Sequence, residues 1–156
     1  MIEIRSGFQT GADIGGILAA KICSVNTGGW IPKGFRTENG NFPELAKFGA
    51  KETESYSYVP RTHANARDSD ATIRFARFFD SRGEKCTLAG IKKHNKPYID
   101  VDFDNPLPVE DVINWINENN IKILNVAGNS ESKAPGIQEF VKKYMIKVIE
   151  GMRNGC

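Results

Sequence analysis

Three polar, glycine-bearing loops contain most of the residues in this sequence whose types and spacing suit ligand chemistry. The first runs Ser6-Gly7-Phe8-Gln9-Thr10-Gly11-Ala12-Asp13, between a strand-like segment and a helix-like one. Glycines at a helix N-terminus expose backbone N–H groups, and the helix dipole there favours phosphate or carboxylate. Because the loop fits neither the G-x-G-x-x-G nor the Walker A pattern, a tight strand-to-helix turn without a ligand is an equally good interpretation.

The second loop, residues 28–36 (GGWIPKGFR), combines two cations with two aromatic side chains. Lys33 and Arg36 suit the neutralisation of phosphate oxygens, and Arg36 has the geometry for a bidentate contact. Trp30 or Phe35 would stack on a base or a pterin ring, although core anchoring is the commoner role of a single aromatic residue. We therefore treat Trp30, Lys33 and Arg36 as candidate ligand contacts.

The third loop, Ala127-Gly128-Asn129-Ser130-Glu131-Ser132, again leads from a strand into a helix. Its amide and hydroxyl groups would hydrogen-bond to a ligand, or would only cap the helix. A further polar segment, Arg67-Asp68-Ser69-Asp70, precedes a buried strand. Its two acids would hydrogen-bond to a ribose or to a pterin edge, or would pair with the neighbouring arginine at the surface.

No residues in the sequence mark a catalytic or metal centre. His63 and His94 lack partners at metal-ligand spacing, and two histidines give no Ser-His-Asp arrangement. The acids placed for attack on a nucleotide N-glycosidic bond are Asp68, Asp70 and Glu131, and no feature assigns them as acid and base. We therefore expect no catalytic residue and no metal.

Composition indicates a soluble, cytoplasmic protein. The cysteines Cys23, Cys86 and Cys156 are odd in number and widely spaced, which predicts free thiols in a reducing cytosol rather than a disulfide framework or a zinc site. A strand-like pattern begins at once after Met1, which leaves no room for a signal peptide, and no apolar run approaches the ~20 residues of a membrane span. The net charge of +2 is too small to indicate nucleic-acid binding.

The elements that must position these loops alternate along the chain. Strand-like patterns cover residues 2–5, 71–76, 98–103 and 121–127. Helix-like patterns follow residue 10, cover 61–68, include Leu88 and Ile91 in a weaker helix that ends before Pro97, and begin near 108 and at 135 or 136. This alternation predicts a Rossmann-like α/β fold with three layers, a mostly parallel sheet and helices on both faces. The 156 residues suffice for a single domain over 1–156, with ligands bound at the carboxyl ends of the strands.

Local details of the first helix and of the segment after it are also predicted. Thr10 and Asp13 have the spacing of a capping box, which would start the helix at Thr10. Gly15 and Gly16 each cost a helix about 1 kcal/mol relative to alanine, so the backbone there should approach the sheet or a ligand closely. Residues 24–49 show no clean period and are expected to be irregular and functional.

Taken together, the loops resemble the molybdenum cofactor carrier family of the SLOG superfamily, Rossmann-like nucleotide-binding domains related to the lysine-decarboxylase-like and phosphoribohydrolase fold. Residues 6–13 resemble its S-G-G-Q-T-G-A-D signature, and residues 29–40 its G-W-x-P-K-G-x-R-x-E-D-G segment. Asn65 through Thr72 match N-x-x-x-S-D-A-T, and residues 124–137 match L-N-V-A-G-P-R-E-S-x-x-P-G-I. The order and spacing of these segments are preserved over almost the whole chain.

This sequence departs from the family pattern at three places. Phe8 replaces a glycine and would add bulk where a phosphate lies close to the backbone, and Asn129-Ser130 replaces Pro-Arg and so removes a cation. Residues 81–87 stand where relatives carry a Gly-Gly-x-x-x-Thr loop. The related phosphoribohydrolases carry P-G-G-x-G-T-x-x-E with a catalytic glutamate. If Thr87 corresponds to that threonine, Gly90 occupies the glutamate position, so this hydrolase chemistry is not supported.

The resemblance implies a non-catalytic protein that holds or sequesters a phosphate-bearing, nucleotide-like molecule. The ligand would be a molybdopterin-type cofactor or an ADP-ribose-type signal such as cyclic ADP-ribose, the latter bound by a phage-encoded sponge with an anti-defense role. The alternatives are an N-glycosidic hydrolase and a ligand-free interaction module. We expect a homo-oligomer, a dimer or tetramer that pairs through the last helix. The candidate ligand contacts are Ser6, Gly7, Phe8, Gln9, Thr10, Gly11, Trp30, Lys33, Arg36, Asn65, Asp68, Asp70, Arg82, Thr87, Gly128, Asn129, Ser130, Glu131 and Ser132.

Overall fold

The structure, a computed structural model, describes residues 1–155, so the thiol expected at Cys156 lies outside the described residues. The strands are β1 (Glu3–Ser6), β2 (Thr27–Ile31), β3 (Arg36–Thr37), β4 (Gly40–Asn41), β5 (Ala50–Glu52), β6 (Ala71–Ala76), β7 (Tyr98–Asp102) and β8 (Ile123–Gly128). The helices are α1 (Ala12–Ile22), α2 (Tyr58–Arg67), α3 (Arg82–Lys93), α4 (Val109–Glu118) and α5 (Ile137–Asn154), with a 3₁₀ helix at Pro43–Phe48. Strands and helices alternate through the chain, as the sequence predicts.

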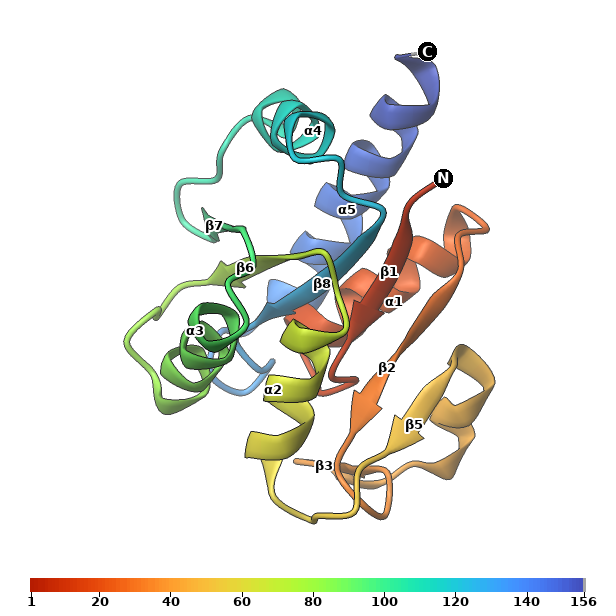
Figure 1. Cartoon of the computed structure of the whole chain (residues 1–156), viewed down its shortest axis with the longest axis vertical. Coiled ribbons are helices and arrows are strands. Elements are labelled where there is room, and N and C mark those ends of the chain that lie inside the picture. The colour runs from red at the N-terminus through yellow and green to blue at the C-terminus, as the bar shows by residue number, and fades with distance from the viewer. Residues whose placement is uncertain (156) are drawn as a thin grey trace.

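Six strands form one parallel sheet in the order β5-β2-β1-β8-β6-β7. Helices α2 and α3 pack together on one face of this sheet, and α1 and α5 pack together on the other (Figure 1). The short strands β3 and β4 pair separately as an antiparallel ribbon. The predicted three-layer, Rossmann-like α/β fold is confirmed. All six sheet strands therefore direct their carboxyl ends, and the loops that follow, to the same edge.

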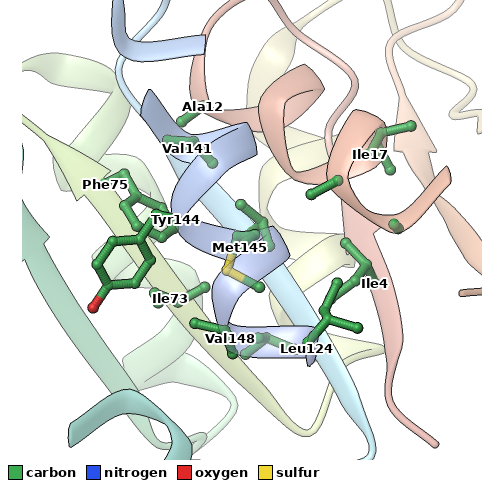
Figure 2. Close-up of a cluster of buried hydrophobic side chains, with 14 of the residues drawn as sticks. Ile4, Ala12, Ile17, Ile73, Phe75, Leu124, Val141, Tyr144, Met145 and Val148 are labelled. Carbon is green, nitrogen blue, oxygen red and sulfur yellow. The ribbon is translucent and has the colours of Figure 1, made fainter. Parts of the chain in front are cut away.

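The hydrophobic core lies between the sheet and the helix pair α1 and α5. Ile4 of β1 and Leu124 of β8 meet Met145 of α5 there (Figure 2). Phe75 of β6 packs edge-on against Tyr144 of α5, with 5.3 Å between the ring centroids. This buried layer fixes the central strands, and with them the starting points of the loops at the carboxyl edge.

Helix α1 begins one residue later than the capping box predicts, since the box would make Thr10 the N-cap. Gly11 is its N-cap and makes no side-chain cap, while the Thr10 hydroxyl contacts other loops. The two internal glycines do mark close packing. A Cβ on Gly15 would stand 2.6 Å from the Gln138 carbonyl oxygen of α5, and one on Gly16 would stand 2.7 Å from Val126 of β8. The helix backbone thus approaches the sheet and α5, not a ligand.

The glycine-rich segment after α1 is more ordered than its sequence pattern indicates, because residues 27–31 form strand β2 in the interior of the sheet. Gly29 adopts φ 143° and lies so close to β1 that a Cβ would stand 2.0 Å from the Ser6 carbonyl oxygen. The glycines here permit close strand packing rather than a loop. None of the helices within residues 1–155 has the length and apolarity that crossing a membrane requires.

Candidate functional site

A cavity of about 420 Å³ opens at the carboxyl edge of the sheet. The N-terminal turns of α1, α2 and α3 line it, together with the turn that follows β8. Each helix N-terminus contributes a partial positive charge, so three dipoles favour negative charge at this position. We divide the cavity into a buried floor, formed by Asp13, Glu84 and Asn129, and an exposed or half-buried rim that includes Arg82, Ser130 and Lys133.

Glu84 is the floor residue with a buried side-chain oxygen that has no hydrogen-bond partner among residues 1–155. It lies in the first turn of α3 and is 3% exposed. Its Oε2 accepts a hydrogen bond of 3.3 Å from the Asn129 amide, whereas its Oε1 is buried and has no partner within the described part of the chain. Burial raises the pKa of Glu84 to about 7, and the Asp13 carboxylate adds to the rise against the lowering effect of Arg74. The side chain is therefore protonated in a large fraction of molecules at neutral pH.

Asp13 and Arg61 form an ion pair in the wall of the cavity, at 3.3 Å between Oδ2 and a guanidinium nitrogen. Burial raises the pKa of Asp13 to about 6, although Arg61 and the backbone N–H groups of Gln9 and Gly7 oppose the rise. The Arg61 guanidinium crosses directly over Gly7, where a Cβ would stand 1.9 Å from it, and it lies 5.6 Å from the centre of the Tyr58 ring. Asp13 thus ties the first loop to helix α2.

Asn129 organises the floor through its side-chain amide. Its oxygen accepts the N–H groups of Arg77 at 2.8 Å and Phe78 at 3.0 Å, and its nitrogen donates to the Phe78 carbonyl and to Glu84. The residue is 1% exposed. It therefore holds the β6–α3 connection against the end of β8 and orients the Glu84 carboxyl group.

A hydrogen-bonded cluster joins the first and third loops at the rim. Glu38 accepts from the hydroxyl groups of Thr10 and Ser132, and Thr10 accepts the N–H of Glu131. These bonds, that of Thr10 first, hold the pKa of the Glu38 carboxyl below its usual range. The predicted convergence of the two loops is thus explained by direct contacts between them.

The structure brings some of the predicted contacts to the cavity and sends others elsewhere. Those that line the cavity are Gln9, Thr10, Arg82, Thr87, Gly128, Asn129 and Ser130. Those outside its lining are Ser6, Gly7, Phe8, Gly11, Trp30, Lys33, Arg36, Asn65, Asp68, Asp70, Glu131 and Ser132. Among the latter, the Ser6 hydroxyl accepts the N–H of Phe8, the Phe8 side chain is fully buried in the core, and Glu131 accepts N–H groups at the start of α5.

The cations of the second loop turn away from the cavity. The Lys33 ammonium lies over the Tyr56 ring, 5.3 Å from its centre. Arg36 donates to the Tyr56 carbonyl, and its guanidinium lies 4.7 Å from the centre of the Tyr58 ring, so it supports the cavity wall from behind. Trp30 donates from its indole nitrogen to Asp68 at 2.8 Å and lines a separate surface hollow.

The remaining candidates bind backbone groups instead of facing the cavity. The Asn65 side chain satisfies both the N–H and the carbonyl of Trp30, at 2.8 and 3.0 Å. Asp70 accepts the N–H groups of Lys122 and Ile123. Hydrogen bonds from Arg67, and then from Trp30, lower the pKa of Asp68 to about 2, so Asp68 is a stable anion within an ion pair.

Sequence reasoning missed several residues that line the cavity, among them the charged residues Asp13, Glu38, Arg61, Glu84 and Lys133. Asp13 stood inside the first signature but was assigned to capping. Glu84 lies in the segment that departs from the family's Gly-Gly-x-x-x-Thr loop, and Lys133 occupies a variable position of the 124–137 segment, so no motif residue marks either of them. The helical period of residues 82–93, which places Glu84 with Thr87 and Ile91 on one buried face, could have indicated Glu84.

Two observations limit the chemistry of the site. Burial, ahead of weaker opposing effects, raises the pKa of the Cys86 thiol in the cavity wall, so it is not an activated nucleophile. Within residues 1–155 no three His, Cys, Asp or Glu side chains are grouped so as to hold a metal ion. What the arrangement can do is bind an anion at the rim and make hydrogen bonds at the floor.

Comparisons with known proteins agree with the loop signatures. A model of the family described as "Circularly permutated YpsA SLOG family" matches residues 4–149. The crystal structure of the "Putative molybdenum carrier protein" from Syntrophus aciditrophicus SB is 29% identical in sequence and superposes with a TM-score of 0.82; the match covers 97% of this chain and 94% of that one. A search of curated proteins gave no significant match.

Proposed function

This chain belongs to the circularly permutated YpsA SLOG family, and from that premise we propose that it is a binding protein which holds a phosphate-bearing, nucleotide-like small molecule in the cavity without converting it. One observation carries the proposal: three helix N-termini meet at a single cavity whose rim also presents Arg82 and Lys133. Helix N-termini with adjacent cations are favourable sites for phosphate groups.

The charges inside the cavity also support an anionic ligand. Three cations line it, Arg61, Arg82 and Lys133, against the carboxyl groups of Asp13, Glu38 and Glu84. The pKa values of Asp13 and Glu84 are raised to about 6 and about 7. Both carboxylates therefore take up a proton readily when an anion approaches, which reduces the negative charge of the cavity.

Isothermal titration calorimetry with inorganic pyrophosphate and with ADP-ribose tests the proposal. We expect binding of both, weakened by roughly 1–3 kcal/mol for each charged contact removed in Arg82→Ala and Lys133→Ala. Lys33→Ala is the matched control, because its ammonium packs on Tyr56 outside the cavity and its loss should leave the affinity unchanged. If neither compound binds, or if the rim variants bind as the parent does, the proposal is wrong.

An N-glycosidic hydrolase is the second candidate, favoured by one observation: the cavity floor presents the unpartnered Oε1 of Glu84. Incubation with ADP-ribose, removal of unbound small molecules by gel filtration, and mass spectrometry of both fractions separate the candidates. The denatured protein fraction of a binder returns intact ADP-ribose, a hydrolase leaves free base in the small-molecule fraction, and the protein fraction of a ligand-free interaction module returns nothing.

The proposal includes two finer versions that differ in the ligand. The related Syntrophus structure is named as a molybdenum carrier, which makes a molybdopterin-type cofactor the first version. Sequestration of an ADP-ribose-type signal such as cyclic ADP-ribose, for example by a phage-encoded sponge with an anti-defense role, is the second. Mass spectrometry of small molecules released from protein purified out of its native cells distinguishes them. We also propose a cytoplasmic location and a dimer or tetramer, the latter tested by sedimentation velocity.

A further inference from the structure

We propose that the floor of the cavity, with Glu84 as its contact residue, holds the neutral polar head of an organic phosphate, so that the protein selects a nucleotide or pterin phosphate over a free oxyanion such as molybdate. The inference rests on the proposed function, because it assumes a phosphate-bearing ligand in this cavity. It adds to that function the class of group that must accompany the phosphate.

The first step is the unused hydrogen-bonding capacity of Glu84. Its Oε1 is buried, lacks a partner within residues 1–155, and belongs to a side chain that lines the cavity. A buried polar atom without a partner costs about 1–3 kcal/mol, a penalty that a ligand atom placed beside it would remove. The Asn129 amide already occupies Oε2 and fixes the carboxyl orientation, so Oε1 is the carboxyl oxygen left for a ligand group that reaches the floor.

The second step is the charge at the floor. Besides Glu84 the floor contains Asp13, and both carboxyl groups are 3% exposed. The charged groups that face Glu84 are Asp13 from α1, Arg61 from α2 and Arg74 from β6. Asp13 balances the charge of Arg61, although the Arg61 Nε has no hydrogen-bond partner among the described residues, and Arg74 makes a bidentate pair with Asp100 at 2.7 Å. Neither cation therefore brings uncompensated positive charge to the floor.

The third step follows from these two. A phosphate or molybdate oxygen at the floor would face two carboxyl groups and no unpaired cation, whereas the rim offers Arg82, Lys133 and the N-terminus of α3. The anionic part of a ligand is therefore held at the rim. A hydroxyl, an amide or a ring nitrogen suits the floor, because a protonated Glu84 donates to its lone pair and Asp13 and Asn129 remain in their own pairs.

The experiment compares compounds with and without a neutral head, using isothermal titration calorimetry on the full chain. ADP-ribose and neopterin triphosphate carry a phosphate and a polar head of the two candidate kinds, whereas pyrophosphate and molybdate carry none. We expect at least one organic phosphate to bind tenfold or more tightly than pyrophosphate, and molybdate to bind more weakly than either. The preferred compound then distinguishes a nucleotide ligand from a pterin.

Variants of Glu84 assign the selectivity to this residue. Glu84→Ala should weaken binding of the preferred organic phosphate about tenfold and leave pyrophosphate binding unchanged or tighter. Glu84→Gln should retain parental binding, because its oxygen can accept from Asn129 while its nitrogen donates into the cavity. Lys85→Ala, on the exposed side of the same helical turn, is the control, and thermal unfolding checks that each variant is folded.

The outcomes separate this inference from the proposed function. Pyrophosphate binding that no organic head improves, molybdate binding as tight as that of the organic phosphates, or an unchanged affinity of Glu84→Ala for all compounds overturns the inference while leaving the binding function standing. Failure of every compound to bind overturns both.

Discussion

Replacement of Glu84 by glutamine is expected to stabilise the protein, and to do so more as the pH rises. The pKa of Glu84 is about 7 in the folded protein, against 4.5 for the ordinary glutamate value. A folded state with the higher pKa binds more protons than the unfolded state between these values, so stability falls as the pH increases through this window. A difference of this size corresponds to about 3 kcal/mol when both states are fully ionised.

Between pH 5 and pH 8 most of that free energy is lost, so the ionisation of Glu84 should cost the parent protein about 2 kcal/mol of stability over this range. Glutamine keeps the shape and the bond from Asn129 without the charge, and the cost disappears. Urea denaturation followed by tryptophan fluorescence at both pH values measures the difference. At each pH we compare the free energy of unfolding of Glu84→Gln with that of the parent. The advantage of the variant should be about 2 kcal/mol larger at pH 8 than at pH 5.

Glu118→Gln, an exposed change at the end of α4, is the matched control and should follow the parent at both pH values. Asp13 also loses its proton in this range, with a pKa of about 6, and its charge raises the pKa of Glu84. Removing the Glu84 charge therefore also eases the ionisation of Asp13, which adds to the difference in the same direction. Parallel stability curves for Glu84→Gln and the parent would refute the assignment of a buried, reluctantly ionised carboxyl at the cavity floor.

Three further predictions test parts of the site. Phe8→Gly should be about 1 kcal/mol more stable than Phe8→Ala, although both lose roughly 3–5 kcal/mol of core packing, because φ at this position is 57°; equal stability in urea would contradict it. Asn129→Ala should lower the free energy of unfolding by at least about 2 kcal/mol, and should also change how stability depends on pH, because Asn129 donates a hydrogen bond to Glu84. A loss below roughly 0.5 kcal/mol would show that the hydrogen bonds of Asn129 are dispensable. Asp68→Asn, which weakens a surface pair with Arg67 and Trp30, should change stability by less than about 1 kcal/mol and leave pyrophosphate affinity unchanged; weaker binding would return Asp68 to the site.

The fold could be predicted because its signals are local and repeated. The apolar run of β8 and the helical period of α5 each specify an element without reference to the rest of the chain. Their alternation with further strands and helices then implies a parallel sheet whose loops share one edge. The family signatures in those loops predicted the SLOG superfamily, and the family match confirms that assignment.

The direction of individual side chains could not be predicted in the same way. Lys33 and Arg36 are residue types typical of a phosphate site, but in the fold they pack on aromatic rings instead. Lys33 lies over the ring of Tyr56 and Arg36 over that of Tyr58, and both rings are distant in the sequence, so the contacts give no local signal. Glu84 shows the reverse case. It lies in the segment that departs from the family's Gly-Gly-x-x-x-Thr loop, so no motif residue marks it, and its contact with Asn129, 45 positions away, becomes visible only in the folded chain.

The hydrogen bonds of the first loop explain how the chain accommodates Phe8 where the family signature has glycine. The Ser6 hydroxyl accepts the N–H of Phe8, and the Asp13 carboxylate accepts that of Gln9, with a further bond from Gly7. These amide hydrogens are therefore already used inside the loop, and a phosphate at this position would have to displace them. Because Phe8 points into the core and blocks nothing in the cavity, the loop keeps its shape at the cost of one strained residue.

The loops around the cavity therefore differ in their roles. The first loop lines the cavity through Gln9 and Thr10, whereas in the proposed function the start of α3 and the turn after β8 bind the anion through Arg82, Ser130 and Lys133. Substitutions in the first loop should therefore act mainly on stability, and substitutions at the rim mainly on affinity. Measuring both quantities for Phe8→Gly and for Lys133→Ala decides the matter: a large loss of pyrophosphate affinity in the former with none in the latter would place the phosphate back on the first loop.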